Sequence, residues 1–183
     1  MERNIAFVAL FAALIAVLGL IPKLTLAAGI PITAQSLGVM LCGTVLGARR
    51  GALAVLLLLL MVALGLPLLA GGRGGLGVFA GPTVGFLVGW VLGAWATGWL
   101  TSRLKMLPLG LAAGLAAALG GIVVIYLPGL VGMVVMLDMT PQAALVSMLA
   151  FLPGDLIKAA LAGTITASLA RARPGIVATR PAG

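Results

Sequence analysis

The chain has 183 residues, of which 63% are hydrophobic and 8% are charged. Because a soluble domain carries about 25% charged residues, this composition excludes a soluble enzyme, a disordered chain and a secreted disulfide scaffold. The net charge is +8, but the basic residues stand mostly in short gaps between apolar runs, where membrane topology explains them better than nucleic-acid binding does. We expect a single integral membrane domain over residues 1–183 that binds no nucleic acid.

Six apolar runs are each long enough for a bilayer-spanning helix, which needs about 20 mainly apolar residues. They cover residues 5–21, 32–48, 51–70, 81–100, 106–127 and 151–170. The sixth helix is predicted to begin near Pro153, since a proline in the first turn followed by an acidic residue is typical of a helix start. Residues 129–150 are then predicted to form an outer loop, with room for a short helix after Thr140. The expected fold is an all-α bundle of six transmembrane helices.

The distribution of basic residues predicts the orientation. Eight of the eleven basic residues lie at the N-terminus, after the second and fourth runs and in the C-terminal tail. Only Lys23 and Arg73 lie in the gaps after the first and third runs, on the other side of the membrane. The positive-inside rule therefore places both termini in the cytoplasm. The remaining one, Lys158, lies inside an apolar segment and needs another explanation.

The first run carries small residues at four-residue spacing. Ala9 and Ala13 form one pair, and Ala12 and Ala16 form a second. In lipid, small residues at this spacing let helix backbones approach closely. These pairs fit either internal packing or a smooth face for a partner protein.

Ionisable and polar side chains in the apolar segments are candidate ligand contacts, because burying them in a membrane is costly. Asp155 and Lys158 are three residues apart and share one helix face, so they fit either an ion pair that closes the helix end or a polar clamp for a ligand. Arg73, in the glycine-rich segment 71–77, fits either a bidentate contact to an acidic ligand or a solvated loop charge. The amide of Gln35 requires a hydrogen-bond partner.

The sequence lacks the residues for several common chemistries. It contains no histidine, which excludes a histidine-based triad and a histidine metal site. Its single cysteine lies inside an apolar run. No phosphate-binding loop is present, so ATP hydrolysis by that route would require a partner. We expect neither a cofactor nor a metal.

Several motifs resemble those of the BioY family, the biotin-specific substrate-binding (S) component of energy-coupling factor (ECF) transporters. They occur in family order at 29–38 (GIPITAQSLG), 46–51 (LGARRG), 65–67 (GLP), 71–77 (GGRGGLG), 81–86 (GPTVGF) and 151–158 (FLPGDLIK). Each motif is modest, but together the set is specific and extends over nearly the whole chain.

The resemblance implies a non-enzymatic transport subunit with six transmembrane helices and a biotin pocket near the outer face of a bacterial cell membrane. It also implies a transmembrane coupling subunit and two ABC ATPases as partners. Ala9 and Ala13 match the Ala-x-x-x-Ala face by which such components meet the coupling subunit. Some family members are thought to work without the full module, which leaves a homo-oligomer open.

The resemblance maps the family's Pro-Gly-Asp-x-x-Lys motif onto Asp155 and Lys158. The carboxylate can accept hydrogen bonds from the N–H donors of the biotin ureido ring, and the ammonium can donate to its carbonyl. The valerate carboxylate favours a cation, for which Arg73 or backbone N–H groups of the glycine-rich loop, including Gly75, are candidates. The other expected contacts are the polar residues Thr33, Gln35 and Thr83 and the aromatic residues Phe86, Trp90 and Tyr126.

Three alternatives remain at this stage. The first is an S component or small transporter for a different vitamin. The second is an intramembrane enzyme, for which the sequence lacks a nucleophile or metal set. The third is a purely structural membrane subunit. A biotin-binding measurement separates all three from the main hypothesis.

Overall fold

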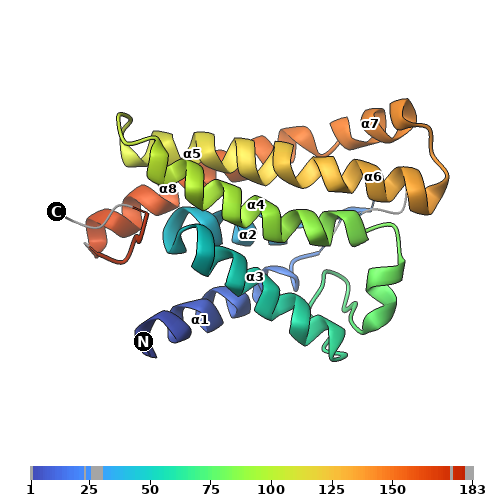
Figure 1. The fold of residues 1–183 in the computed structure, drawn as a ribbon, viewed down its shortest axis with the longest axis horizontal. Helices are drawn as coiled ribbons and strands as arrows, with labels where there is room; N and C mark the ends of the chain where they lie inside the picture. Colours follow the sequence, from blue (N-terminus) through green and yellow to red (C-terminus); the bar gives the residue numbers. More distant parts are fainter. Residues whose placement is uncertain (1, 23, 26–30, 174, 180–183) are drawn as a thin grey trace.

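A computed structural model describes residues 2–22, 24–25, 31–173 and 175–179, so Lys23 and Arg180 of the orientation argument lie outside the described residues. Within these residues the fold is all-α apart from one two-residue antiparallel strand pair (Figure 1). The elements are α1 (Glu2–Leu18), β1 (Leu24–Thr25), β2 (Pro31–Ile32), α2 (Gln35–Leu46), α3 (Ala48–Ala63), η1 (Leu76–Ala80), α4 (Val84–Arg103), α5 (Leu109–Ala118), η2 (Leu119–Val124), α6 (Ile125–Leu137), α7 (Pro141–Leu149) and α8 (Leu152–Ala172).

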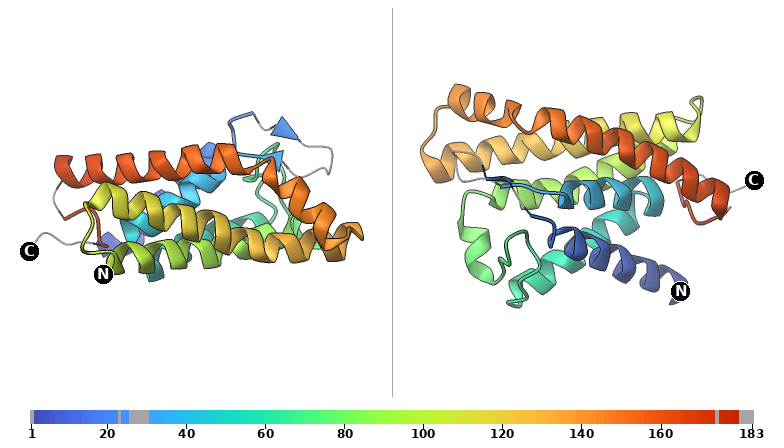
Figure 2. Two further views of the ribbon diagram at one scale, coloured as in Figure 1. Left: turned by 90° about the horizontal axis from the view of Figure 1, so that it is seen from above. Right: turned by 180° about the vertical axis from the view of Figure 1, so that it is seen from behind.

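The bundle is built around α4, which packs against α2, α3, α5 and α6. Helix α1 packs against α2 and α3, and α8 packs against α5 and α2. Figures 1 and 2 show the start of α1, the α4–α5 turn and the end of α8 at one end of the bundle, with the α3–α4 connection and the α6–α7 turn at the other. Arg103 and Arg171 therefore lie at the end where the chain begins.

Large apolar side chains cover the outside of the bundle. Helices α5 and α6, with the π-helical turn η2 between them, expose a stripe at four-residue spacing that comprises Leu111, Leu115, Leu119, Val123, Leu127, Val131 and Val135. Among the described residues, α4 and the continuous helix Leu109–Leu137 are each long and apolar enough to cross a membrane. Helices α7 and α8, which meet at a 54° bend, would make a third span. An apolar exterior of this kind indicates a membrane protein.

Two predicted boundaries were wrong. Residues 129–137 were expected in a loop, but α6 continues to Leu137 with Pro128 inside it. Membrane helices tolerate an internal proline, because neighbouring helices and local helix adjustments compensate for the lost hydrogen bond. The third run was expected to stay helical to residue 70, but α3 ends at Ala63, and Gly65 adopts a left-handed φ of 102°. The short helix after Thr140 is present, and the Thr140 hydroxyl caps it by accepting from the Ala143 N–H.

Small residues set the α4–α6 packing. A Cβ atom at Gly89 would lie 2.7 Å from the Ile125 carbonyl oxygen, and one at Gly93 would lie 2.7 Å from the Gly120 carbonyl oxygen. Both distances are shorter than van der Waals contact, so only glycine allows the backbones to approach this closely. The close approach fixes Ile125 and its neighbour Tyr126 beside α4.

Candidate functional site

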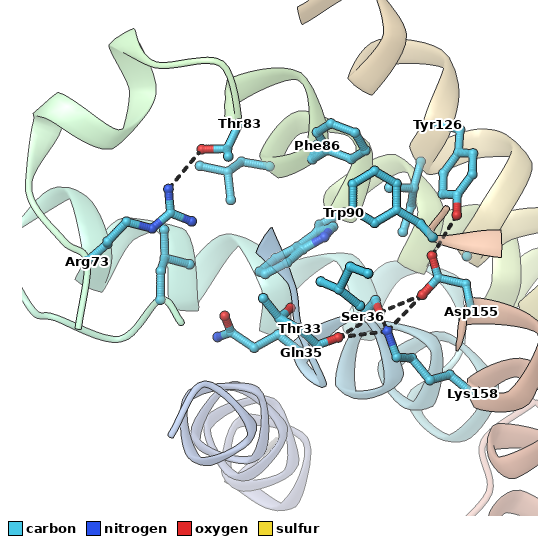
Figure 3. A pocket seen from close by; sticks show the side chains of 16 residues that line it. Thr33, Gln35, Ser36, Arg73, Thr83, Phe86, Trp90, Tyr126, Asp155 and Lys158 are labelled. Carbon is cyan, nitrogen blue, oxygen red and sulfur yellow. Dashed lines mark hydrogen bonds and ion pairs between the residues drawn. The ribbon is translucent and has the colours of Figure 1, made fainter. Parts of the chain in front are cut away.

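A partly enclosed cavity lies between α2, α4, η2, α6, α8 and the loop after α3. Figure 3 shows the side chains around it. The lining residues are Ile32, Thr33, Gln35, Ser36, Leu69, Arg73, Thr83, Phe86, Leu87, Trp90, Gly121, Ile125, Tyr126, Phe151, Asp155 and Lys158. These residues are dispersed through the sequence from position 32 to 158, so the tertiary fold assembles the site.

An ion pair forms one end of the cavity. Asp155 lies in the first turn of α8, where the positive end of the helix dipole favours a carboxylate. The Lys158 Nζ atom lies 2.9 Å from Asp155 Oδ1, and the side chains are 15% and 9% exposed, respectively. The pair is thus largely withdrawn from solvent but still borders the cavity, which fits the ligand-clamp hypothesis.

Three further groups complete this network. Lys158 Nζ donates to the Thr33 carbonyl oxygen at 2.7 Å and to Ser36 Oγ at 3.0 Å. Ser36 Oγ lies 3.2 Å from Asp155 Oδ1, and the Tyr126 hydroxyl donates to Asp155 Oδ2 at 2.8 Å. All three ammonium hydrogens have acceptors, whereas Oδ2 has one described donor and retains a lone pair for another.

Arg73 lies at the other end of the cavity (Figure 3). Its Nε atom donates to the Ala70 carbonyl at 3.4 Å and Nη1 to Thr83 Oγ1 at 3.5 Å, both long hydrogen bonds. No carboxylate among the described residues forms an ion pair with it. Partial burial lowers the pKa of the Arg73 guanidinium, but an arginine stays protonated at physiological pH. A cation with weakly used donors is suited to binding an anionic group.

Aromatic rings line the space between the two polar ends. The Phe86 and Phe151 ring centroids lie 6.1 Å apart, and those of Tyr126 and Phe151 lie 6.5 Å apart, nearly edge to face. Trp90 is buried and lies between Arg73 and the ion pair in Figure 3. The cavity is therefore bipolar, with a carboxylate–ammonium network at one end, a guanidinium at the other and apolar walls between them.

The structure brings together nine of the ten residues predicted to contact a ligand. Gly75 is the exception, because it does not line the cavity and its N–H donates to the Val62 carbonyl at 2.7 Å. Gln35 lines the cavity, but both hydrogens of its amide are donated to main-chain carbonyls. Its amide therefore has no free donor for a ligand.

Ser36 and Phe151 line the cavity although neither was singled out as a contact. Ser36 follows Gln35 directly in the first turn of α2, where it meets both charges of the ion pair. Phe151 lies four residues before Asp155, and its carbonyl accepts the Asp155 N–H at 3.0 Å. The four-residue spacing from Asp155 would have indicated Phe151, whereas the contact of Ser36 with the ion pair depends on the tertiary packing of α2 against α8.

The two alanine pairs of α1 differ in exposure. Ala9 and Ala13 are exposed, whereas Ala12 is fully buried and Ala16 is half-buried. Only the first pair is therefore available on the surface of the bundle.

Comparisons with known proteins give concordant results. The BioY family model matches residues 2–175. The chain is 50% identical to "Biotin transporter BioY" of Rhodobacter capsulatus over 98% of this chain and 100% of that protein. It is 52% identical to the protein of the same name from Rhizobium etli, over 89% and 90% of the two chains. The crystal structure of an S-component for biotin from an ECF-type ABC transporter superposes with a TM-score of 0.88 and 28% identity, over 93% of this chain and 92% of that one.

Proposed function

The chain belongs to the BioY family, and we propose that it binds biotin as the substrate-binding component of an ECF-type vitamin transporter. The single observation that carries this proposal is the bipolar cavity, because biotin is itself bipolar. It has a ureido ring with two N–H donors and a carbonyl at one end, a carboxylate at the other and apolar atoms between them. The transporter names of its relatives support transport rather than catalysis.

The ureido ring faces the Asp155–Lys158 network in this proposal. Asp155 Oδ2 accepts one ureido N–H through its remaining lone pair, beside the bond from Tyr126. The ureido carbonyl accepts from Lys158 or Ser36, each of which exchanges an internal hydrogen bond for one to the ligand. Such exchanges cost little, because the internal and ligand bonds are of the same kind.

The valerate carboxylate faces Arg73 in this orientation. The guanidinium offers a fork of donors that matches a carboxylate, and the two long bonds to Ala70 and Thr83 hold it toward the cavity. The thiophane ring packs against Phe86, Trp90 and Phe151, whose apolar surfaces require no hydrogen bond. Thr83 acts through Arg73 in this arrangement.

We also propose six membrane spans, formed by α1, α2, α3, α4, the continuous α5–η2–α6 helix and α8, in a bacterial cell membrane. The basic residues after α4 and α8 mark the cytoplasmic end, so the cavity opens toward the exterior. Helix α2 has only 12 residues. Ile32 and Thr33, which precede it outside the helix, line the cavity, which is where a membrane tolerates irregular backbone.

Energy for transport comes from partners in this proposal, namely a coupling subunit and two ABC ATPases. The exposure of Ala9 and Ala13 supports α1 as the docking helix, since small residues let a partner helix approach closely. A homo-oligomer is the alternative assembly if the chain works alone.

A binding titration with purified protein tests the proposal. We expect wild type to bind biotin, and Asp155→Asn and Lys158→Ala each to weaken binding by about tenfold or more, equivalent to about 1.4 kcal/mol. The matched controls are Asp138→Asn and Lys105→Ala, since both residues are exposed and absent from the cavity lining. Wild-type affinity in both cavity variants would reject the site, and a preference for another vitamin would reject the specificity.

A further inference from the structure

The Gln35 side chain lies at a junction of three chain segments. It is the first residue of α2 and is 1% exposed. Its Nε2 atom donates to the Ile15 carbonyl of α1 and to the Leu68 carbonyl of the α3–α4 connection, both at 3.0 Å. Its Oε1 atom accepts the Ala70 N–H at 2.9 Å. Figure 3 shows the amide directed away from the ion pair.

The two bonds to the connection reproduce the pattern of a β-sheet. Leu69 pairs on one edge with Arg73, with N–H to carbonyl distances of 3.0 and 3.1 Å. The Leu68 carbonyl and the Ala70 N–H point to the opposite edge, as alternate groups of an extended chain do. The Gln35 amide bonds to both of these groups, donating to the Leu68 carbonyl and accepting from the Ala70 N–H, as the backbone of a third strand would.

The position of the Arg73 guanidinium depends on this segment. Arg73 Nε donates to the carbonyl of Ala70, the residue whose N–H is held by Gln35. Ala70 is buried and Leu68 is half-buried, so without the Gln35 amide the buried Ala70 N–H and the partly buried Leu68 carbonyl would lose this partner, which is unfavourable enough to move the segment.

The contact with α1 is equally close. A Cβ atom at Gly19, just after α1, would lie 2.7 Å from the Leu68 carbonyl oxygen and 2.8 Å from Gln35 Nε2. Glycine at this position therefore allows the end of α1, the start of α2 and the connection to meet.

We propose that Gln35 is a positioning residue that holds the Arg73 loop against α1 and thereby sets recognition of the ligand carboxylate. It makes this contribution without touching the ligand through its amide. The inference rests on the proposed function, in which Arg73 binds the carboxylate of biotin. It assigns Gln35 a role distinct from the direct ligand contact expected from the sequence.

The experiment measures the affinities for biotin and for biotin methyl ester, which lacks the anionic carboxylate. Wild type should prefer biotin by about tenfold or more, the contribution expected from a hydrogen bond to a charged group. Arg73→Met should abolish the preference. Gln35→Met, similar in shape but without the amide, should reduce the preference to a similar degree with little change in affinity for the ester. In the Arg73→Met background it should cost no further biotin affinity.

Gly19→Ala perturbs the same junction sterically and should also reduce the preference, which keeps the inference testable if Gln35→Met does not fold. Gly77→Ala is the matched control, because a Cβ atom there meets nothing within 4 Å. An unchanged preference in the folded junction variants, or an equal loss of affinity for both ligands, would overturn the inference. A wild-type protein that binds neither ligand would instead overturn the proposed function.

Discussion

Removing the Lys158 ammonium should separate the structural role of the ion pair from its role in binding. Lys158→Met deletes three donated hydrogen bonds and leaves the Asp155 carboxylate with Ser36 and Tyr126 as its remaining described donors. Breaking a buried ion pair from one side destabilises a protein by about 3–5 kcal/mol. We expect the lower end of that range, because two hydrogen-bond donors to the carboxylate remain.

The double variant Asp155→Asn/Lys158→Met removes both charges and should recover most of the lost stability, since replacing a buried pair as a whole is often nearly neutral. Biotin affinity should not recover, because both ligand contacts are lost, at about 1.5–3 kcal/mol for each hydrogen bond to a charged group. Thermal unfolding and biotin titration in the same detergent measure the two quantities. A double variant that regains both stability and wild-type affinity would show that the pair is only structural.

Further predictions concern the cavity wall, the helix packing and the partner surface. Tyr126→Phe keeps the ring but loses the donor to Asp155 Oδ2, so biotin affinity should fall about tenfold; unchanged affinity by titration would contradict the predicted contact. Gly89→Ala should lower the free energy of unfolding by about 1–3 kcal/mol through a clash with Ile125, whereas Gly81→Ala, whose nearest atom would lie at 3.9 Å, should unfold like wild type. Ala13→Leu should prevent co-purification with the coupling subunit and leave biotin affinity unchanged; normal complex formation would exclude this face as the docking surface.

The all-α fold and the main helices could be predicted because hydrophobic run length is a local property of the sequence. Asp155 and Lys158 could likewise be paired because a three-residue spacing on a helix places both side chains on one face. The charges alone fitted either a closed ion pair or a ligand clamp, and the family resemblance favoured the clamp. The other lining residues come from elements far apart in the sequence, so local patterns could not assemble the cavity.

The helix through Pro128 could not be predicted from local rules. A proline interrupts helices in water, but here the helix packs closely on Gly85 and Gly89 of α4, and a π-helical turn precedes it. These contacts depend on the tertiary arrangement of two segments about 40 residues apart. The local signal at Pro128 was therefore overridden by packing.

The role of Gln35 was also hidden from the sequence. Its need for a partner was evident, because an amide in an apolar helix cannot remain unpaired. The partners, however, are main-chain groups 20 to 35 positions away, of Ile15, Leu68 and Ala70. Main-chain acceptors carry no residue-specific signal, so the sequence could indicate only that a bond was required.

The most direct test of the bipolar cavity is an experimental structure of the chain with biotin bound. We predict ureido nitrogen within hydrogen-bond distance of Asp155 Oδ2, the carboxylate against the Arg73 guanidinium, and the thiophane ring against Phe86 and Trp90. Biotin bound outside this cavity, or inside it with the carboxylate at Lys158 and the ureido ring at Arg73, would contradict the proposed site.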